Sequence, residues 1–442
     1  MGITWRPGGS PPRADSIVTM DVTPLAPWIA RQRWYRRTGE EPRLRVLGAL
    51  PLASLDPDAR IRILLVLDES GSVPAVYQVP VVERSREVLL TAVIAEADGV
   101  SIVDGPYDPA FGPALLWAMT SDRDAGLAVR RSAVLSGEQS NTSVLIERPD
   151  APPAVAKVFR VLHHGQNPDA ELQRVLSDAG VAFVPRFVGE LLARWPDATG
   201  TESDGHLAIA QEFVAGAEDG WDLALRSAAA GTDLRPTATA LGAATAVLHA
   251  VLAERLPVRA AQPADIEATV SLWRSRLDSA VRLASPLEPL AAAIDGVYRA
   301  AQSEPWPVLQ RIHGDLHLGQ LLHRAADDRW VFLDFEGEPL RTLAERTAPE
   351  PALRDVAGML RSFDYAAAFG HAPDAAWAQA CTAGYLAGYA EVAGDAATVH
   401  RQLLEAFELD KAVYEVVYEV RNRPDWVGIP LAAIERIIGG GA

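Results

Sequence analysis

The 442-residue chain is predicted to be an α+β protein with a β-rich amino-terminal part and a large helical carboxy-terminal lobe. Apolar runs of about four to eight residues, separated by Pro, Gly and charged residues, occur in the first half and are typical of strands. Long alanine-rich segments follow residue 212 and are typical of helices. A cluster of His, Asp and Gln at 313–320 places the candidate chemistry within the helical half.

The order of the elements follows from these patterns. Apolar alternation, proline starts and alanine-rich stretches each indicate one type of element. The first element is a short helix at 28–35, and the terminus at 1–21 is expected to be loosely ordered. Strands are then expected at 61–67, 75–80, 154–159, 207–214 and 330–333, and helices after Pro168 and at 233–254, 263–285, 354–365 and 407–421.

Composition narrows the classes of function. A formal charge of −17 argues against nucleic-acid partners, because phosphate backbones require clustered Lys and Arg. Charges interrupt the apolar runs, so neither a membrane span nor a secretory signal is expected. The single cysteine, Cys381, allows no disulfide within the chain and is expected to be a buried small side chain. These features predict a cytoplasmic enzyme. We further expect a monomer that acts on a small-molecule substrate.

The spacing of Asp315, Gln320 and Asp334 is typical of phosphotransferase active sites. Kinases use one Asp to accept the proton of the substrate hydroxyl, an amide five residues later to hold magnesium, and a second Asp after a buried strand to hold the ions on the phosphates. We therefore expect Asp315 to be the catalytic base and Gln320 and Asp334 to bind Mg²⁺. Taken separately, the two segments could be a polar turn and the end of a strand. A purely metal-binding role for the histidines is disfavoured, because no cysteine accompanies them.

The upstream half offers a candidate site for ATP. The small polar turn within 135–146 could enclose the phosphates, with contacts from Ser140, Asn141 and Thr142. Lys157 is a lone lysine in an apolar strand, and burying it is costly unless it is paired. Glu171, just after a proline-marked helix start, is its predicted partner. A surface lysine at a strand end is the alternative.

A later strand is expected to bind the adenine ring. Its end is the segment of Gln211, Glu212, Phe213 and Val214, and Gly216 breaks the pattern soon after it. In a two-lobed kinase this position is the hinge, whose backbone would hydrogen-bond the adenine edge. The side chains here could equally serve packing.

Seven segments together resemble maltokinase-like sugar kinases of the aminoglycoside-phosphotransferase type, at 31–35, 138–143, 211–213, 313–320, 334–339, 353–365 and 410–426. The resemblance implies a bilobal fold like that of eukaryotic protein kinases. It also implies three parts: an amino-terminal cap subdomain at 1–100, an intermediate ATP-clamping subdomain at 101–212 and a helical lobe at 213–442. That lobe would supply the sugar site. Separately, Asp355 and Arg361 in the helix at 354–365 are expected to brace the catalytic loop as a structural ion pair rather than to contact the substrate.

The branches of this group differ in the sugar they phosphorylate. Maltokinases form maltose 1-phosphate, whereas relatives similar to glucosamine kinases form glucosamine 6-phosphate. Divergence at 36–41 and a row of acidic residues on one helix face favour glucosamine, since carboxylates can bind an ammonium group. A solvated acidic face is the alternative, as is a packing role for Trp426. The expected sugar contacts are Asp315, His317, Glu336, Glu408, Asp410, Lys411, Glu415 and Trp426.

Other classes of protein fit the sequence less well. A catalytically inactive relative would be expected to lose Asp315 or Asp334, and both are present. An aminoglycoside phosphotransferase would share the catalytic residues, but the segments 354–365 and 410–426 resemble the sugar kinases. A protein kinase is disfavoured because no Ala-Pro-Glu segment follows Asp334 at the expected place.

Overall fold

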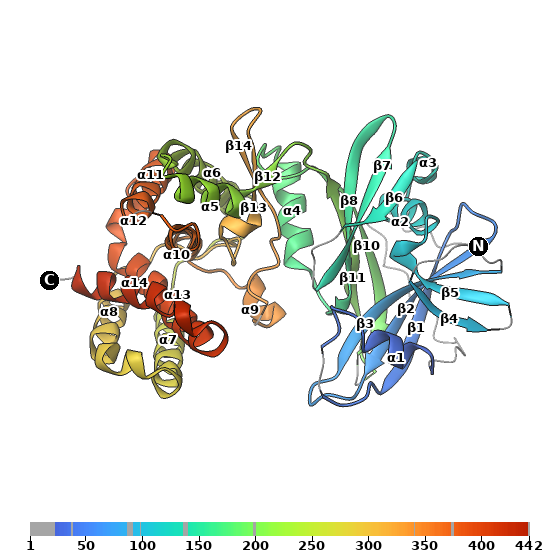
Figure 1. Ribbon diagram of the computed structural model, residues 1–442, viewed down its shortest axis with the longest axis horizontal. Helices are drawn as coiled ribbons and strands as arrows, with labels where there is room; N and C mark the ends of the chain where they lie inside the picture. Colours follow the sequence, from blue (N-terminus) through green and yellow to red (C-terminus); the bar gives the residue numbers. More distant parts are fainter. Residues whose placement is uncertain are drawn as a thin grey trace. The chain divides into compact units, whose positions relative to one another are not determined.

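The computed structural model describes residues 23–36, 39–85, 92–97, 99–135, 140–197, 200–339, 341–372 and 375–440. The chain forms two compact units, Met1–Arg174 with Pro185–Val214 and Val175–Val184 with Ala215–Ala442. The first is β-rich and the second is mainly helical, which confirms the predicted α+β class (Figure 1). The terminus at 1–21, positions 37 and 38 of the divergent segment and positions 136–139 of the phosphate turn lie outside the described residues.

The first unit contains two antiparallel sheets. One has the strand order β1-β2-β3-β5-β4, with β9 also paired to β3, and the other has the order β10-β11-β8-β7-β6. The strands are β1 Leu44–Leu52, β2 Ala59–Asp68, β3 Ala75–Arg84, β4 Val93–Ala97, β5 Val100–Asp104, β6 Arg131–Val134, β7 Asn141–Arg148, β8 Ala151–Phe159, β9 Val161–Leu162, β10 Phe187–Pro196 and β11 Glu202–Glu212. The helices are α1 Leu25–Ile29, α2 Phe111–Thr120, α3 Arg123–Leu127 and α4 Pro168–Asp178.

One hydrophobic core joins these two sheets. It includes Ile63 of β2 and Ile209 of β11, each at most 2% exposed. Gln78 of β3 adds a polar link, because its buried side-chain amide donates to the carbonyl oxygens of Phe159 at 2.8 Å and Leu207 at 2.9 Å. The predicted cap and intermediate parts therefore pack as one unit, and a boundary between them at residue 100 stays a prediction.

The helix predicted at 28–35 is wrong over most of its length. The helix α1 ends at Ile29, and the chain then turns. Trp34 and Tyr35 pack on Tyr77 of β3, with ring centroids 5.8 and 5.3 Å from it. Burying these large rings on the sheet outweighs the local preference for helix.

The second unit is helical and has one small sheet, of order β12-β13-β14. The helices predicted at 233–254 and 263–285 are confirmed as α6 and α7. The helices are α5 Gly220–Ala230, α6 Arg235–Arg255, α7 Pro263–Leu283, α8 Ala291–Ser303, α9 Leu343–Thr347, α10 Leu353–Phe369, α11 Ala376–Ala393, α12 Ala396–Val399, α13 Arg401–Asn422 and α14 Gly428–Gly439. The strands are β12 Glu218–Asp219, β13 Leu321–Arg324 and β14 Arg329–Phe332.

Helices α6 and α11 pack unusually closely, backbone against backbone (Figure 1). A Cβ atom at Gly242 of α6 would lie 1.9 Å from the carbonyl oxygen of Tyr385, and one at Gly388 of α11 would lie 1.9 Å from that of Thr239. By length and composition, α6 is the one helix among the described residues that could cross a membrane, and 44% of its most apolar window is buried. Its contacts with α11 account for this apolar character.

Candidate active site

A buried carboxylate holds the predicted catalytic loop in shape. Asp355, in the first turn of α10, is 1% exposed and accepts hydrogen bonds from the backbone N–H groups of His313 at 2.7 Å and Gly314 at 2.9 Å. Gly314 has φ of +85°, a conformation that glycine adopts without steric cost. His249 Nε2 of α6 lies 3.0 Å from the same carboxylate. The predicted bracing role of Asp355 is confirmed, and it orients the loop that carries Asp315.

The loop of Asp334 lies directly beside the catalytic loop. His313 Nε2 lies 2.9 Å from the carbonyl oxygen of Leu333, and the N–H of Leu333 donates to the carbonyl oxygen of Gln320 at 3.0 Å. Asp334 itself has φ of +59°, a left-handed conformation that Asp tolerates better than most residues. The fold thus brings together the two loops that carry Asp315, Gln320 and Asp334.

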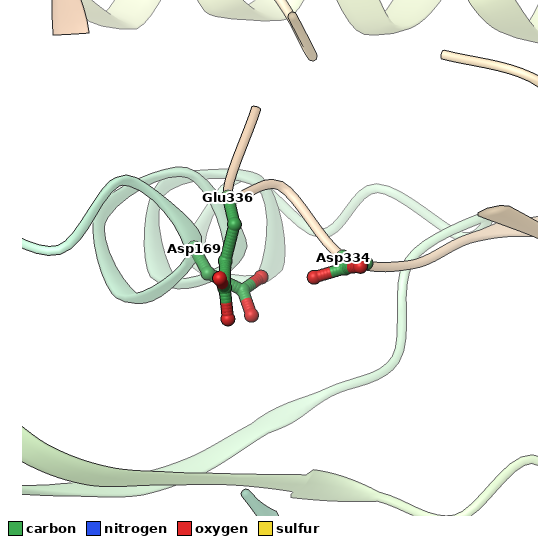
Figure 2. Close-up of side chains that lie close together, drawn as sticks. All are labelled: Asp169, Asp334 and Glu336. Carbon is green, nitrogen blue, oxygen red and sulfur yellow. The ribbon is translucent and has the colours of Figure 1, made fainter. Parts of the chain in front are cut away.

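Two carboxylates in this second loop make a candidate metal site. Asp334 and Glu336 are separated by one residue, and each offers an oxygen within 4.8 Å of the other's (Figure 2). Carboxylate oxygens, with the amide oxygen of Gln320, fit a hard cation such as Mg²⁺. The sequence predicts a sugar contact for Glu336, but its position beside Asp334 makes it a candidate metal ligand instead.

In the first unit, Lys157 of β8 is paired with an acidic residue of α4. Its Nζ atom donates to Asp169 Oδ2 at 3.0 Å, and the two side chains are 15% and 4% exposed. Asp169 lies in the first turn of α4 (Figure 2), two residues before the predicted partner Glu171. Lys157 is therefore largely covered and paired with an acidic residue, whereas the pair with Glu171 stays a prediction. Spacing alone does not choose between two carboxylates in one helical turn.

The described part of the phosphate turn begins at Ser140, directly before β7. Asn141 is the first residue of β7 and Thr142 the second. Thr142 is 7% exposed, and its hydroxyl accepts a hydrogen bond from Arg160 Nε at 2.8 Å. Arg160 is fully buried and also donates to Asp104 at 2.9 Å. Thr142 therefore supports packing inside the first unit, which leaves Ser140 and Asn141 as the better candidates for phosphate contact.

The predicted hinge lies at the end of β11. The backbone N–H of Glu212 donates to the carbonyl oxygen of Arg186, and that of Phe213 donates to the carbonyl oxygen of Pro153, both at 2.8 Å. The side chain of Gln211 bonds to Gln173 of α4. Because these two N–H groups are already used, recognition of adenine here would depend on the carbonyl groups and on Val214.

Among the described residues of the second unit, Lys411 lines two pockets. The charged pocket has a volume of about 420 Å³ and is lined by Leu272, Arg276, Gly314, Asp315, Leu316, Glu338, Pro339, Arg341, Glu345, Arg354, Asp355, Gly358, Phe407, Asp410, Lys411 and Tyr414. The aromatic pocket has a volume of about 530 Å³ and is lined by Trp221, His317, Gly319, Gly358, Arg361, Ser362, Tyr365, Phe369, Lys411, Tyr414, Glu415, Tyr418, Glu419 and Arg423. Gly358, Lys411 and Tyr414 line both pockets, and Lys411 Nζ lies 3.9 Å from Asp315 Oδ1.

The acidic face predicted on 407–421 does not form one continuous groove. Glu408 is 4% exposed and accepts a hydrogen bond from Arg436 of α14 at 2.6 Å. Glu419 lines the aromatic pocket but is held by Arg423 at 2.7 Å. Glu408 lines neither of the two pockets, and a contact between Glu408 and the sugar stays a prediction. Helix packing, which helical periodicity does not reveal, buries this residue against another helix.

Glu415 is the acidic residue of α13 that is best placed for a ligand. Arg361 donates two hydrogen bonds to it, at 2.7 and 2.9 Å, and both reach Oε2. Within the described residues, Oε1 has no hydrogen-bond partner. Burial raises the pKa of Glu415, and the charge of Arg361 only partly offsets this. A cationic ligand group beside Oε1 would compensate the carboxylate.

The aromatic residues of the second pocket were not predicted from the sequence. Tyr414 and Tyr418 are 47% and 43% exposed on α13, and Tyr365 and Phe369 face them from α10. In each pair the two residues have i,i+4 spacing, which places them on one helix face, and this spacing was the signal in the sequence that could have identified them. Trp426 stacks on Phe369, a residue of the pocket lining, with ring centroids 3.8 Å apart. A direct contact between Trp426 and the sugar stays a prediction.

The surroundings of His317 favour its neutral form. Burial lowers its pKa below the ordinary 6.5, and the opposing effect of Asp315 does not restore it. Nδ1 accepts a hydrogen bond from the N–H of Gly319 at 3.1 Å, so the ring is held beside the aromatic pocket. A neutral His317 can exchange hydrogen bonds with a sugar hydroxyl without adding a positive charge.

Cys381 is expected to be inert in the folded protein. It is fully buried in α11, and burial raises the pKa of its thiol to about 12, so the reactive thiolate is scarce at pH 8. We expect less than a tenth of the protein to be alkylated by iodoacetamide at pH 8 during an hour, against complete labelling in denaturant, as measured by intact mass. Rapid labelling of the native protein would contradict the packing of α11.

Comparison with known proteins shows which family the chain resembles. A model described as the phosphotransferase enzyme family matches residues 132–394, and one described as the maltokinase N-terminal cap domain matches 28–108. A glucosamine kinase of Streptacidiphilus jiangxiensis is 32% identical over 327 residues, which are 66% of this chain and 70% of the relative. One of Mycolicibacterium smegmatis is 28% identical over 347 residues, covering 72% and 82%. A solved glucosamine kinase in complex with glucosamine, ADP and inorganic phosphate is 26% identical, with a TM-score of 0.64 over 90% of this chain and 95% of that chain.

The matched segments contain the elements described above. The larger match includes β8, the catalytic loop and the loop of Asp334. The smaller match includes β1 to β5 of the first sheet. The chain therefore belongs to the phosphotransferase enzyme family, as a kinase of a sugar hydroxyl group that carries a maltokinase-type cap domain.

Proposed function

We propose that this kinase transfers the γ-phosphoryl group of ATP to the 6-hydroxyl group of glucosamine. The names of the two relatives and of the solved neighbour support this substrate. The observation that carries the proposal is Glu415, an incompletely compensated carboxylate in an aromatic pocket that adjoins the catalytic loop. A sugar ring there would have aromatic surfaces for its C–H groups and an acceptor for its ammonium group.

In the proposed catalytic step, each residue near the sugar hydroxyl group has one role. Asp315 orients the sugar hydroxyl and accepts its proton, as the corresponding Asp does in other kinases. Lys411, whose Nζ is 3.9 Å from Asp315, holds the carboxylate at the boundary between the two pockets. His317 offers a neutral hydrogen-bonding group to the same ring. The backbone bonds of Asp355 keep this arrangement ready before the substrate arrives.

The proposed nucleotide contacts are given for each unit by itself. Lys157 and the segment 211–214 are the proposed ATP contacts in the first unit, together with Ser140 and Asn141. Gln320, Asp334 and Glu336 are the proposed Mg²⁺ ligands in the second. When bound, Mg²⁺ would neutralise phosphate charge. The cytoplasmic location, the monomeric state and the absence of nucleic-acid or membrane partners stay predictions.

The substitution Glu415→Gln tests the proposed amino-sugar site. Removing the carboxylate charge should raise KM for glucosamine about 10- to 100-fold, since a hydrogen bond to a charged group contributes about 1.5–3 kcal/mol. KM for glucose, which has no ammonium group, should change less than about threefold by the same reasoning. Steady-state kinetics with both sugars and phosphorus-coupled NMR of the products measure this.

The matched control is Glu405→Gln, the same change on the same helix at a residue outside both pockets that pairs with Arg401. It should leave both KM values unaltered. If Glu415→Gln raised KM for glucosamine and for glucose by the same factor, the proposed contact between Glu415 and the ammonium group would be wrong. Absence of glucosamine 6-phosphate from the wild-type reaction would reject the substrate itself.

Maltose is the second candidate acceptor, and its product would be maltose 1-phosphate. The cap match and the cationic Lys411 at the boundary of the pockets favour a neutral sugar. An aminoglycoside is disfavoured, because its several ammonium groups need several acceptors, and in the aromatic pocket Glu419 is already paired with Arg423. Including maltose and one aminoglycoside in the kinetic panel distinguishes these cases.

A further inference from the structure

The proposed function leaves the charged pocket without an occupant. The proposed sugar ring lies in the aromatic pocket, of about 530 Å³, whereas the charged pocket, of about 420 Å³, has no assigned ligand. Each volume lies in the range of about 300–1,000 Å³ found for small-molecule sites. Asp315 lines the charged pocket directly. A molecule bound at the catalytic carboxylate could therefore extend into it.

Asp410 indicates that this pocket receives a hydrogen-bond donor. It is 7% exposed, and its Oδ2 accepts a hydrogen bond from Arg276 Nη1 at 2.6 Å. Its Oδ1 is buried and has no hydrogen-bond partner among the described residues. Burial raises the pKa of Asp410. Buried acceptors are rarely left unpaired, so a hydroxyl group of a ligand would complete this one.

The charges of the pocket point to a neutral ligand. Arg276 is paired with Asp410, and Arg354 is paired with Glu338 at 3.0 Å. Arg341 lies 3.4 Å from the same Glu338. Because these charges are paired, the pocket has little net electrostatic attraction for a phosphate or for a second ammonium group. The hydroxyl groups of a sugar ring can form hydrogen bonds with both the cationic and the anionic side chains.

The pocket also has apolar surface suited to a sugar. Leu272 of α7, Phe407 and the half-exposed Tyr414 form part of its wall. Sugar rings combine apolar C–H faces with hydroxyl edges, so aromatic and aliphatic walls beside charged groups match both. Tyr414 lines both pockets and would contact both parts of a two-ring molecule.

We propose that the acceptor is a glucosamine-containing disaccharide or glycoside, whose neutral second ring occupies the charged pocket and donates a hydroxyl to Asp410 Oδ1. This inference rests on the proposed function, because it places the amino sugar in the aromatic pocket. A link through the anomeric carbon of glucosamine leaves its 6-hydroxyl group free. Such a compound can therefore be phosphorylated at the same position as glucosamine.

A substitution at the rim of the charged pocket tests the proposal. Leu272 is 42% exposed on α7, so Leu272→Trp should fold and partly fill the pocket. The matched control is Leu283→Trp, at a residue of the same helix that is 48% exposed and lines neither pocket. Kinetics are measured with glucosamine and with glucosaminyl-glucose, in which C1 of glucosamine is linked to glucose.

The expected result is a KM for glucosaminyl-glucose at least about tenfold below that for glucosamine, about 1.4 kcal/mol from the added hydrogen bond and contacts. Leu272→Trp should abolish this preference, and Leu283→Trp should retain it. Phosphorylation of glucosamine with no use of the disaccharide would overturn this inference and leave the proposed function standing. A preference that survives Leu272→Trp would also overturn it. Phosphorylation of neither compound would reject both proposals.

Discussion

Replacing Asp315 with Asn is expected to lower kcat by about 100- to 10,000-fold, the usual contribution of a positioned general base. An amide occupies the same space but cannot accept the proton of the sugar hydroxyl. The dissociation constant for ATP should change little, because the lost interaction is made with the acceptor in the transition state. Single-turnover kinetics and calorimetric titration of ATP measure the two quantities separately.

Asp327→Asn is a suitable control for this change. It removes one negative charge from the exposed turn between β13 and β14, where Asp327 pairs with Arg324. Turnover should remain at the wild-type level. If Asp315→Asn kept more than a tenth of the wild-type kcat, proton acceptance would have to be assigned to another group. A parallel loss of ATP binding would indicate that Asp315 belongs to the nucleotide site.

Asp355→Asn is expected to destabilise the fold by about 3–5 kcal/mol, the usual result of breaking a buried charged network. The carboxylate accepts hydrogen bonds from two backbone N–H groups of the catalytic loop and lies 3.0 Å from His249 Nε2. An amide has one oxygen, so at least one buried donor would lose its partner. Turnover should fall as well, because Asp315 follows the two residues that Asp355 holds.

The pH dependence of stability separates this role from simple packing. Burial alone would raise the pKa of Asp355, but His249, His313 and Gly314 together hold it below the usual value. A carboxylate with a lowered pKa stabilises the fold above its unfolded pKa of about 3.9, and the effect disappears as the pH falls through the folded value. The difference in unfolding free energy between wild type and Asp355→Asn should therefore shrink toward acid pH.

Denaturant titrations between neutral and acid pH measure this difference. Asp278→Asn, at an exposed position on α7, is the control and should leave the unfolding free energy unchanged at every pH. A constant difference between wild type and Asp355→Asn across the pH range would contradict the hydrogen-bonded carboxylate. Full turnover in a destabilised Asp355→Asn protein would show that the loop keeps its shape without this residue.

Short-range patterns were sufficient to predict most elements and to locate the candidate catalytic loop. Asp315, Gln320 and Asp334 lie close in sequence, and a buried strand between the loops restricts how far apart they can lie. The helices α6, α7, α10 and α13 have strong local preferences, so their positions follow from composition. The prediction of a helix at 28–35 was wrong over most of its length, because burial of Trp34 and Tyr35 on the sheet outweighed a weak local preference for helix.

The sequence by itself determined the class of chemistry, because the candidate catalytic and metal-binding residues occur in two short segments with characteristic spacing. Only the tertiary structure decided which charged groups are available to ligands. Periodicity places Glu408 and Glu415 on one face of α13, but α14 buries the first while the second opens into the aromatic pocket. The tertiary structure also decided two pairings, that of Lys157 with Asp169 and that of Asp355 with His249. Their side chains belong to separate elements, which meet only when the whole chain packs.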